Sequence, residues 1–227
     1  QWASAEADLS LPRGPALSER FESGRNFSNK LWNATRFVLM HLEGFEAGDL
    51  VAAAGNGGSF EALEDRWLAS RLASVTRAAN RATDGYRFAE MAGDLYAFAW
   101  DEFCSAYLEL CKSRLADPAT RDRARSMLLM SLDTILRLLH PVMPFVTEEI
   151  WQHLREVAPG RRLPWDGGEA PAESLMAARW PEPPEAWIDP VTEERFRLFL
   201  GVIGGIREVR SRQNVPPRTA VKVAIRA

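Results

Sequence analysis

One segment, residues 25–42, carries a polar face made only of amides and cations. At helical spacing its apolar residues form one stripe, and the polar residues fall on the opposite side. An ordinary solvated helix face mixes both signs of charge, whereas Asn, Lys and Arg together can donate hydrogen bonds to phosphates and to base edges. The stripe is Phe27, Leu31, Ala34, Val38 and Leu42, and the polar face is Asn26, Asn29, Lys30, Asn33 and Arg36. The pattern indicates a nucleic-acid contact.

We expect a few side chains of this segment to give the contact its specificity. Arg36 and Lys30 are the leading candidates for phosphate or base contacts, and Asn29 and Asn33 can donate and accept at base edges. Phe37 offers a ring for stacking on a base. The alternative is that Asn29 and Asn33 satisfy backbone groups of a neighbouring helix. The candidate RNA-binding residues here are Arg25, Asn29, Lys30, Asn33, Arg36 and Phe37.

A second group of cations lies near the end of the chain. Residues 207–227 contain several arginines and one lysine, with Glu208 as the only acid. The net charge of the whole chain is −3, which argues against a wholly basic nucleic-acid binder. Basic patches on an acidic body suit a partner that is held and then released. Arg207, Arg210 and Arg212 are therefore candidate phosphate contacts, and ion pairs with acids of the bundle are an equally good interpretation.

No pattern typical of catalysis or metal binding occurs in the sequence. The three histidines form no His-x-x-x-His pair. The Gly-rich residues 55–58 follow no predicted strand and lack the Gly-Lys-Ser/Thr ending of a phosphate loop. Cys104 and Cys111 would lie about 10 Å apart on one predicted helix, too far for a disulfide. We therefore expect no catalytic residue, no metal and no cofactor in this chain, and two free thiols.

The apolar periodicity predicts an all-α fold, an antiparallel helical bundle with a small α/β or strand appendage at the C-terminus. The chain has 227 residues, of which 46% are hydrophobic, enough for a sizeable core. We expect a connector at residues 1–17, the bundle at 18–157, and a Pro-rich excursion with a helix and a strand at 158–227. The predicted helices span about 18–42, 60–84, 86–115, 118–139, 144–157 and 189–215.

Local signals support these boundaries. Two Asp-Pro pairs, Asp117-Pro118 and Asp189-Pro190, each predict an N-cap followed by proline at the first helical position. Residues 220–226 alternate like a strand. Three glycines inside the last helix, at 201, 204 and 205, predict the close approach of another backbone, because each costs about 1 kcal/mol relative to alanine. We expect the aromatics on the apolar stripes to pack in the core, namely Trp32, Trp67, Trp100, Phe103 and Trp151.

The hydropathy of the chain and its first residues indicate its cellular location. No apolar run approaches the roughly 20 residues that span a bilayer. The first residues lack the basic and apolar regions of a signal peptide, and the chain starts with Gln1. We therefore expect a cytoplasmic fragment of a longer protein, with no membrane contact, and we expect it to be a monomer.

Residues 27–39 read Phe-x-Asn-Lys-Leu-Trp-Asn-Ala-x-Arg-Phe-Val-Leu, and this string resembles the first helix of the anticodon-binding domain of valyl-tRNA synthetases. Three later segments match in the family's order: residues 100–110, the run Leu139-His140-Pro141 through Trp151, and Gln213-Asn214-Val215-Pro216-Pro217. The His-Pro-x-x-Pro-Phe match is shared with the isoleucyl and leucyl enzymes, so the first string is the discriminating one. Together the matches cover nearly the whole chain.

The resemblance implies a function for the polar face. It implies a domain that positions valine tRNA, through its anticodon region, for aminoacylation by a catalytic domain that uses ATP and Mg²⁺. The two ATP-site signatures of class I synthetases do not occur here, so this chain would not activate an amino acid. The family's C-terminal coiled-coil arm would also lie outside it. The alternatives are a non-catalytic helical scaffold that binds another protein or domain, and the equivalent domain of an isoleucyl or leucyl enzyme.

Overall fold

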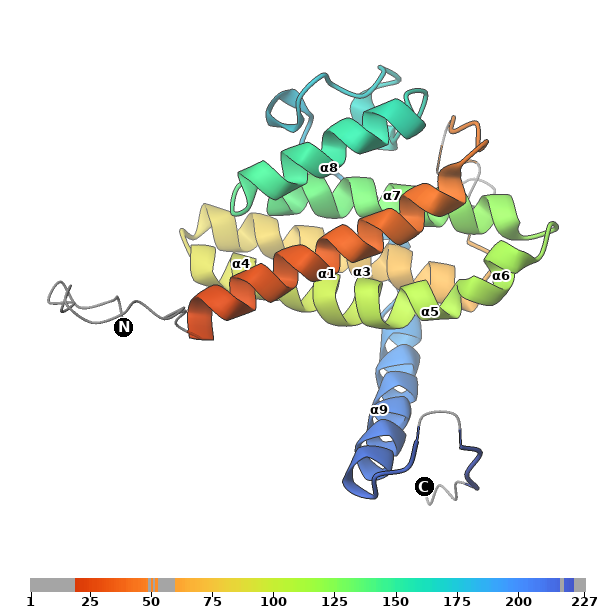
Figure 1. Cartoon of the computed structure of the whole chain (residues 1–227). Helices are drawn as coiled ribbons and strands as arrows, with labels where there is room; N and C mark the ends of the chain where they lie inside the picture. Colours follow the sequence, from red (N-terminus) through yellow and green to blue (C-terminus); the bar gives the residue numbers. More distant parts are fainter. Residues whose placement is uncertain (1–18, 49, 51, 53–59, 217–218, 223–227) are drawn as a thin grey trace, which may run out of the picture.

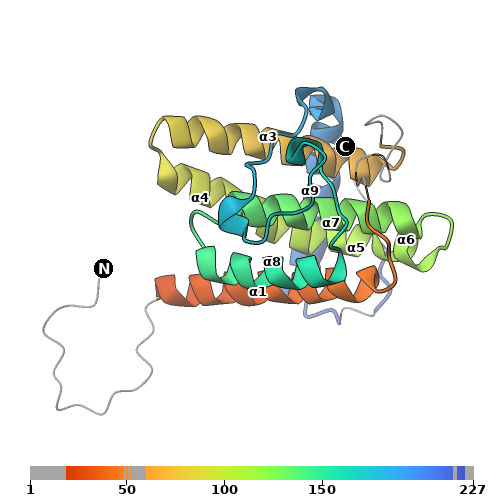
Figure 2. The ribbon, with the colours of Figure 1, turned by 90° about the horizontal axis from the view of Figure 1, so that it is seen from above.

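The structure is a computed structural model that describes residues 19–48, 50, 52, 60–216 and 219–222 (Figure 1). Figure 1 shows α1, the α3–α4 hairpin and the α7–α8 hairpin packed together, while α9 leaves the bundle crosswise. Figure 2 shows from above that α8 lies along α1. The helices are α1 (Glu19–Leu42), α3 (Leu63–Asp84), α4 (Phe88–Ala97), the π-helix η1 (Phe98–Tyr107), α5 (Leu108–Leu110), α6 (Lys112–Ala116), α7 (Arg121–Leu139), α8 (Pro144–Val157) and α9 (Pro190–Arg212). The predicted helical bundle is confirmed.

The core forms where the predicted apolar stripes meet. All five stripe residues of α1 are buried, because that face packs against η1, α7 and α8. Helix α7 is buried on nearly every side and lies at the centre of the bundle. Of the five aromatics predicted in the core, Trp67, Phe103 and Trp151 are buried, and Trp32 and Trp100 are half-buried against it.

The predicted third helix, over 86–115, is the element whose form differs most from expectation. It consists of α4, the ten-residue π-helix η1, α5 and α6. Phe88, the first residue of α4, is 53% exposed. A π-helix bonds each N–H to the carbonyl five residues earlier, a pairing that apolar periodicity does not predict.

The two Asp-Pro signals have different outcomes. Asp189 is the N-cap of α9, and its carboxylate accepts a hydrogen bond from the Thr192 N–H at 3.0 Å. The start predicted at Pro118 is wrong, since α7 begins at Arg121. Asp117 instead caps a preceding turn, where its carboxylate accepts from the Ala119 N–H.

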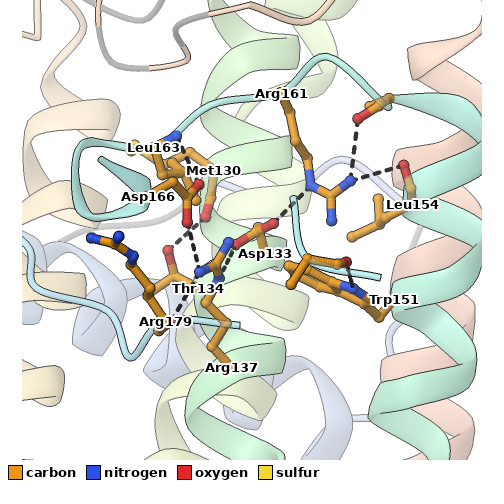
Figure 3. Close-up of polar contacts among 12 residues, drawn as sticks. Met130, Asp133, Thr134, Arg137, Trp151, Leu154, Arg161, Leu163, Asp166 and Arg179 are labelled. Carbon is orange, nitrogen blue, oxygen red and sulfur yellow. Dashed lines mark hydrogen bonds and ion pairs between the residues drawn. The ribbon is translucent and has the colours of Figure 1, made fainter. Parts of the chain in front are cut away.

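The Pro-rich excursion is a covering segment with three short 3₁₀ turns: η2 (Pro164–Asp166), η3 (Leu175–Ala177) and η4 (Glu185–Trp187). Figure 3 shows how charged side chains fasten it to α7. Arg161 donates to Asp133 at 2.7 Å, and Arg137 donates both to Asp133 at 2.6 Å and to Asp166 at 2.8 Å. Both guanidinium groups lie over the ring of Trp151.

Two expectations for the C-terminal region are not met. The strand over residues 220–226 is not seen: residues 220–222 are irregular, and residues 223–227 lie outside the described residues. A Cβ built on any of the three glycines inside α9 would meet nothing within 4 Å, so the predicted close approach of another backbone is wrong for the described chain. Figure 1 shows that α9 projects from the bundle, which agrees with the lack of a close neighbour at these glycines.

Candidate nucleic-acid interface

The polar face of α1 points away from the core as predicted. Arg25, Asn29, Asn33 and Arg36 are exposed. Within the described part of the chain, none of these four side chains makes a hydrogen bond or an ion pair. The two asparagines therefore do not satisfy the backbone of a neighbouring described helix, and their amides are open to a partner. Whether any of them contacts RNA stays a prediction.

Lys30 differs from the rest of this face because its ammonium group is already held. Its Nζ lies 2.5 Å from Ser105 Oγ and 3.9 Å from the centroid of the Trp100 ring. The Ser105 hydroxyl donates to the Trp100 carbonyl at 2.7 Å, which leaves its oxygen lone pairs for Lys30. The charge of Lys30 is therefore fixed at the seam between α1 and η1, and the side chain is only half-buried there.

Phe37 lies one turn from the end of α1, beside a histidine. It is half-buried, and its ring meets His41 edge to face at 4.5 Å. Burial, and then the charge of Arg125, lower the pKa of His41 below its ordinary value. The imidazole is therefore neutral at pH 7, and the positive charge of this face comes from Lys30 and the arginines.

The C-terminal cations are not equivalent in the structure. Arg207 is exposed and makes no ion pair with a described residue. Arg210 donates to the carbonyl oxygens of Thr219 and Pro216, so its guanidinium group is already engaged. Arg212 pairs with Glu208 at 2.5 Å, four residues earlier on the same exposed face. Arg207 is thus the freest of the three predicted phosphate contacts.

The two predicted basic groups do not merge into one surface. A groove of about 260 Å³ separates α9 from η1 and α5, with Arg207 on one wall and Ser105 on the other. Asp101, Glu102 and Glu109 also line this groove. Glu102 and Glu109 are paired with Arg71 and Lys112, whereas Asp101 makes no ion pair with a described residue. The Asp101 carboxylate would repel a phosphate backbone, so a nucleic acid would meet the α1 face and the α9 cations as separate sites.

Charged residues buried in the bundle were missed at the sequence level. Asp133, Arg161 and Arg137 are at most 4% exposed. One signal could have found them, because Asp133 and Arg137 stand four residues apart in a helix that is apolar on all sides. Charges in such a setting must be paired.

Other site types find no support among the residues the structure describes. No group of three or more His, Cys, Asp or Glu side chains is arranged to hold a metal ion. No described helix is both long and apolar enough to cross a membrane. Both cysteines are free thiols.

Comparison with known proteins places the chain among tRNA ligases. The family model described as the anticodon-binding domain of tRNA ligase matches residues 65–225. The chain is 47% identical to the valine–tRNA ligase of Rhodopirellula baltica, over all of the chain and 21% of that protein. It is 41% identical to the enzyme of Fervidobacterium nodosum, over 91% of the chain and 21% of that protein. The Nostoc sp. enzyme is 39% identical over 95% of the chain. The chain thus spans about a fifth of the length of these relatives.

Proposed function

Since this chain belongs to the family of tRNA-ligase anticodon-binding domains, we propose that it holds the anticodon region of valine tRNA within a valine–tRNA ligase. The observation that carries the proposal is the exposed strip on α1, in which Arg25, Asn29, Asn33 and Arg36 have no partner in the described chain. An unstacked loop needs donors for base edges and cations for phosphates. This strip supplies both on one rigid helix.

Aminoacylation belongs to the longer enzyme. We propose that a catalytic domain outside this chain performs it with ATP and Mg²⁺, and that the ligase works as a monomer in the cytoplasm. The valine–tRNA ligases similar to this chain, each about four to five times as long, support this division. The 227-residue chain alone should then show no valine-dependent ATP–pyrophosphate exchange, a reaction measured with labelled pyrophosphate. Exchange that copurifies with the chain and survives removal of contaminating ligase would contradict the division.

Substitutions on α1 test the proposed role in reading the anticodon. Arg36→Ala in a valine–tRNA ligase that carries this domain should cost about 1–3 kcal/mol of discrimination between valine tRNA and an anticodon variant. The loss arises because a guanidinium directed at a base edge recognises one base, whereas a phosphate contact carries no sequence information. The measurement is kcat/KM for charging each tRNA. Arg77→Ala, on an exposed arginine of α3, is the matched control and should change neither value.

The outcomes of this test separate the possible roles of α1. Equal losses on both tRNAs would assign Arg36 to the phosphate backbone. If Arg36→Ala, Asn29→Ala and Asn33→Ala all leave both rates unchanged, α1 does not read the anticodon. The helical-scaffold interpretation would then be favoured.

A further inference from the structure

Three aromatic rings gather beside the polar face of α1, at the seam with α4 and η1. The rings of Tyr96 and Trp100 stack with centroids 5.6 Å apart and an interplanar angle of 12°. Phe27 closes the group from α1, 4.8 Å from Tyr96 and 6.3 Å from Trp100. Phe27 is buried, Trp100 is half-buried, and Tyr96 remains 38% exposed. Tyr96 is therefore the outer ring of a packed aromatic group.

The π-helix fixes the inner part of this group. Because η1 bonds residues five apart, Trp100 and Ser105 come to the same side, and the Ser105 hydroxyl donates to the Trp100 carbonyl. Lys30 then contacts both residues, with its ammonium group over the Trp100 ring. The cation and the rings are held in place before any ligand arrives, so binding would cost little side-chain entropy.

The neighbours of the aromatic group are suited to RNA. Asn26 and Asn33 lie one turn before and one turn after Lys30 on the same side of α1, and both are exposed. The seam therefore presents a ring, a cation and two amides within a short stretch of α1. Exposed aromatics elsewhere lack this setting, for example Phe145, which is 90% exposed at the start of α8.

We propose that Tyr96 is a stacking residue for an unpaired base of the RNA loop, with Trp100 and Ser105 as positioning residues and Lys30 beside the adjoining phosphate. This inference rests on the proposed function and adds a subsite to it. A base stacks on a tyrosine ring through its π-face, so the subsite tolerates any base and contributes affinity, while the exposed amides and Arg36 contribute specificity. The Tyr96 hydroxyl makes no hydrogen bond to a described residue and is available to the sugar or base.

The test measures binding of the 227-residue chain to a valine-tRNA anticodon stem-loop that carries 2-aminopurine, whose fluorescence falls on stacking. Tyr96→Leu should weaken binding about tenfold and remove the quenching, because the ring is lost. Tyr96→Phe keeps the ring and should bind within about twofold of the unmodified chain. Phe145→Leu is the matched control for loss of an exposed aromatic and should change nothing.

Salt dependence separates stacking from charge. Tyr96→Leu should leave the slope of log Kd against log salt unchanged, whereas Lys30→Gln should lower it by about one unit. Unchanged affinity and quenching in Tyr96→Leu would overturn the subsite while leaving the proposed function standing. If Tyr96→Leu fails to fold, Tyr96→Trp replaces it, because tryptophan also offers a ring for stacking. Binding with quenching of the 2-aminopurine fluorescence would support the subsite, and binding without that quenching would overturn it. Failure of the unmodified chain to prefer the stem-loop over one with a scrambled loop would overturn the proposed function as well.

Discussion

The Nε atom of Arg161 lies 2.7 Å from Oδ2 of Asp133, and both side chains are fully buried. This contact joins the start of the Pro-rich excursion to the middle of α7. Asp133 uses its other carboxylate oxygen to accept from Arg137, which in turn holds Asp166 of η2. The excursion has few regular hydrogen bonds of its own, so its position depends on contacts with the helices, and this network supplies the buried charged ones (Figure 3).

Loss of Arg161 should destabilise the domain strongly. Arg161→Met should lower the free energy of unfolding by about 3–5 kcal/mol, because it leaves the Asp133 carboxylate buried with one partner fewer. Urea unfolding followed by circular dichroism measures the change. Arg162→Met is the matched control, because Arg162 follows Arg161 in the chain but is exposed. It should change the free energy of unfolding by less than about 0.5 kcal/mol. Equal effects of the two substitutions would contradict the structural role of the network.

A second buried carboxylate should make stability depend on pH. Burial raises the pKa of Asp65 above 3.8, more than the hydrogen bonds from Arg114 and Tyr107 lower it. In Arg114→Met the pKa of Asp65 should rise further, because the carboxylate loses the guanidinium group that stabilises its charged form. The folded state then favours protonated Asp65. When the pKa of a carboxyl is higher in the folded state than in the unfolded state, the protein loses stability as the pH rises from the unfolded-state pKa through the folded-state pKa. The deficit of Arg114→Met should therefore be larger at pH 7 than at pH 4.

Asp65 and Arg114 line a groove on the surface of the bundle, and the control for Arg114→Met lies in that groove. Arg123 also lines it, but this arginine is exposed and pairs with the exposed Glu61. Arg123→Met should have a small deficit with little pH dependence. Urea unfolding at both pH values measures the two variants, and a deficit for Arg114→Met that is the same at pH 4 and pH 7 would contradict the prediction.

The two thiols should be unreactive in the folded chain. Burial raises the pKa of Cys104 and of Cys111 to about 12. Since the thiolate is the nucleophile, alkylation by iodoacetamide at pH 8 should be slowed more than about hundredfold relative to the chain in urea. Mass spectrometry of the labelled protein gives the rate at each cysteine. Rapid labelling of Cys111 under native conditions would show that its burial is not maintained.

The C-terminal arginines should contribute unequally to the salt dependence of tRNA binding. Arg207→Gln should lower the salt slope of tRNA binding by about one unit, for all tRNAs alike. Arg210→Gln should change it less, because Arg210 is engaged with the carbonyls of Thr219 and Pro216. The measurement is tRNA affinity across a salt series, with valine tRNA and an unrelated tRNA. A larger effect from Arg210 than from Arg207 would reverse this order.

The sequence predicted those features that depend on local pattern. The α1 stripe and the Asp189 N-cap are confirmed, because helical periodicity and capping act within one turn of the chain. The exposed polar face of α1 follows from the same periodicity. What these residues bind is a separate matter, and their RNA contacts stay predictions.

Features that depend on contacts between distant residues could not be predicted in this way. The π-helix carries no local signal, and its Ser105 contacts Lys30, 75 residues earlier in the chain. Asp117-Pro118 met the rule for a helix start, yet the Asp117 carboxylate stabilises a turn instead. The glycines of α9 make no packing contact with a described residue, and periodicity cannot show that a helix leaves the bundle.

The projection of α9 divides that helix into two parts of unequal stability. Near its start, the Phe196 ring stacks on Trp67 of α3 at 4.6 Å, whereas most side chains beyond Leu200 face solvent. Amide hydrogens beyond Gly201 should therefore exchange through local opening, far faster than those of the buried α7. The part of α9 beyond Gly201 should therefore fray without unfolding of the bundle. Arg207 would then sample a volume of solvent instead of one fixed point, which enlarges the region from which an anionic partner can be captured.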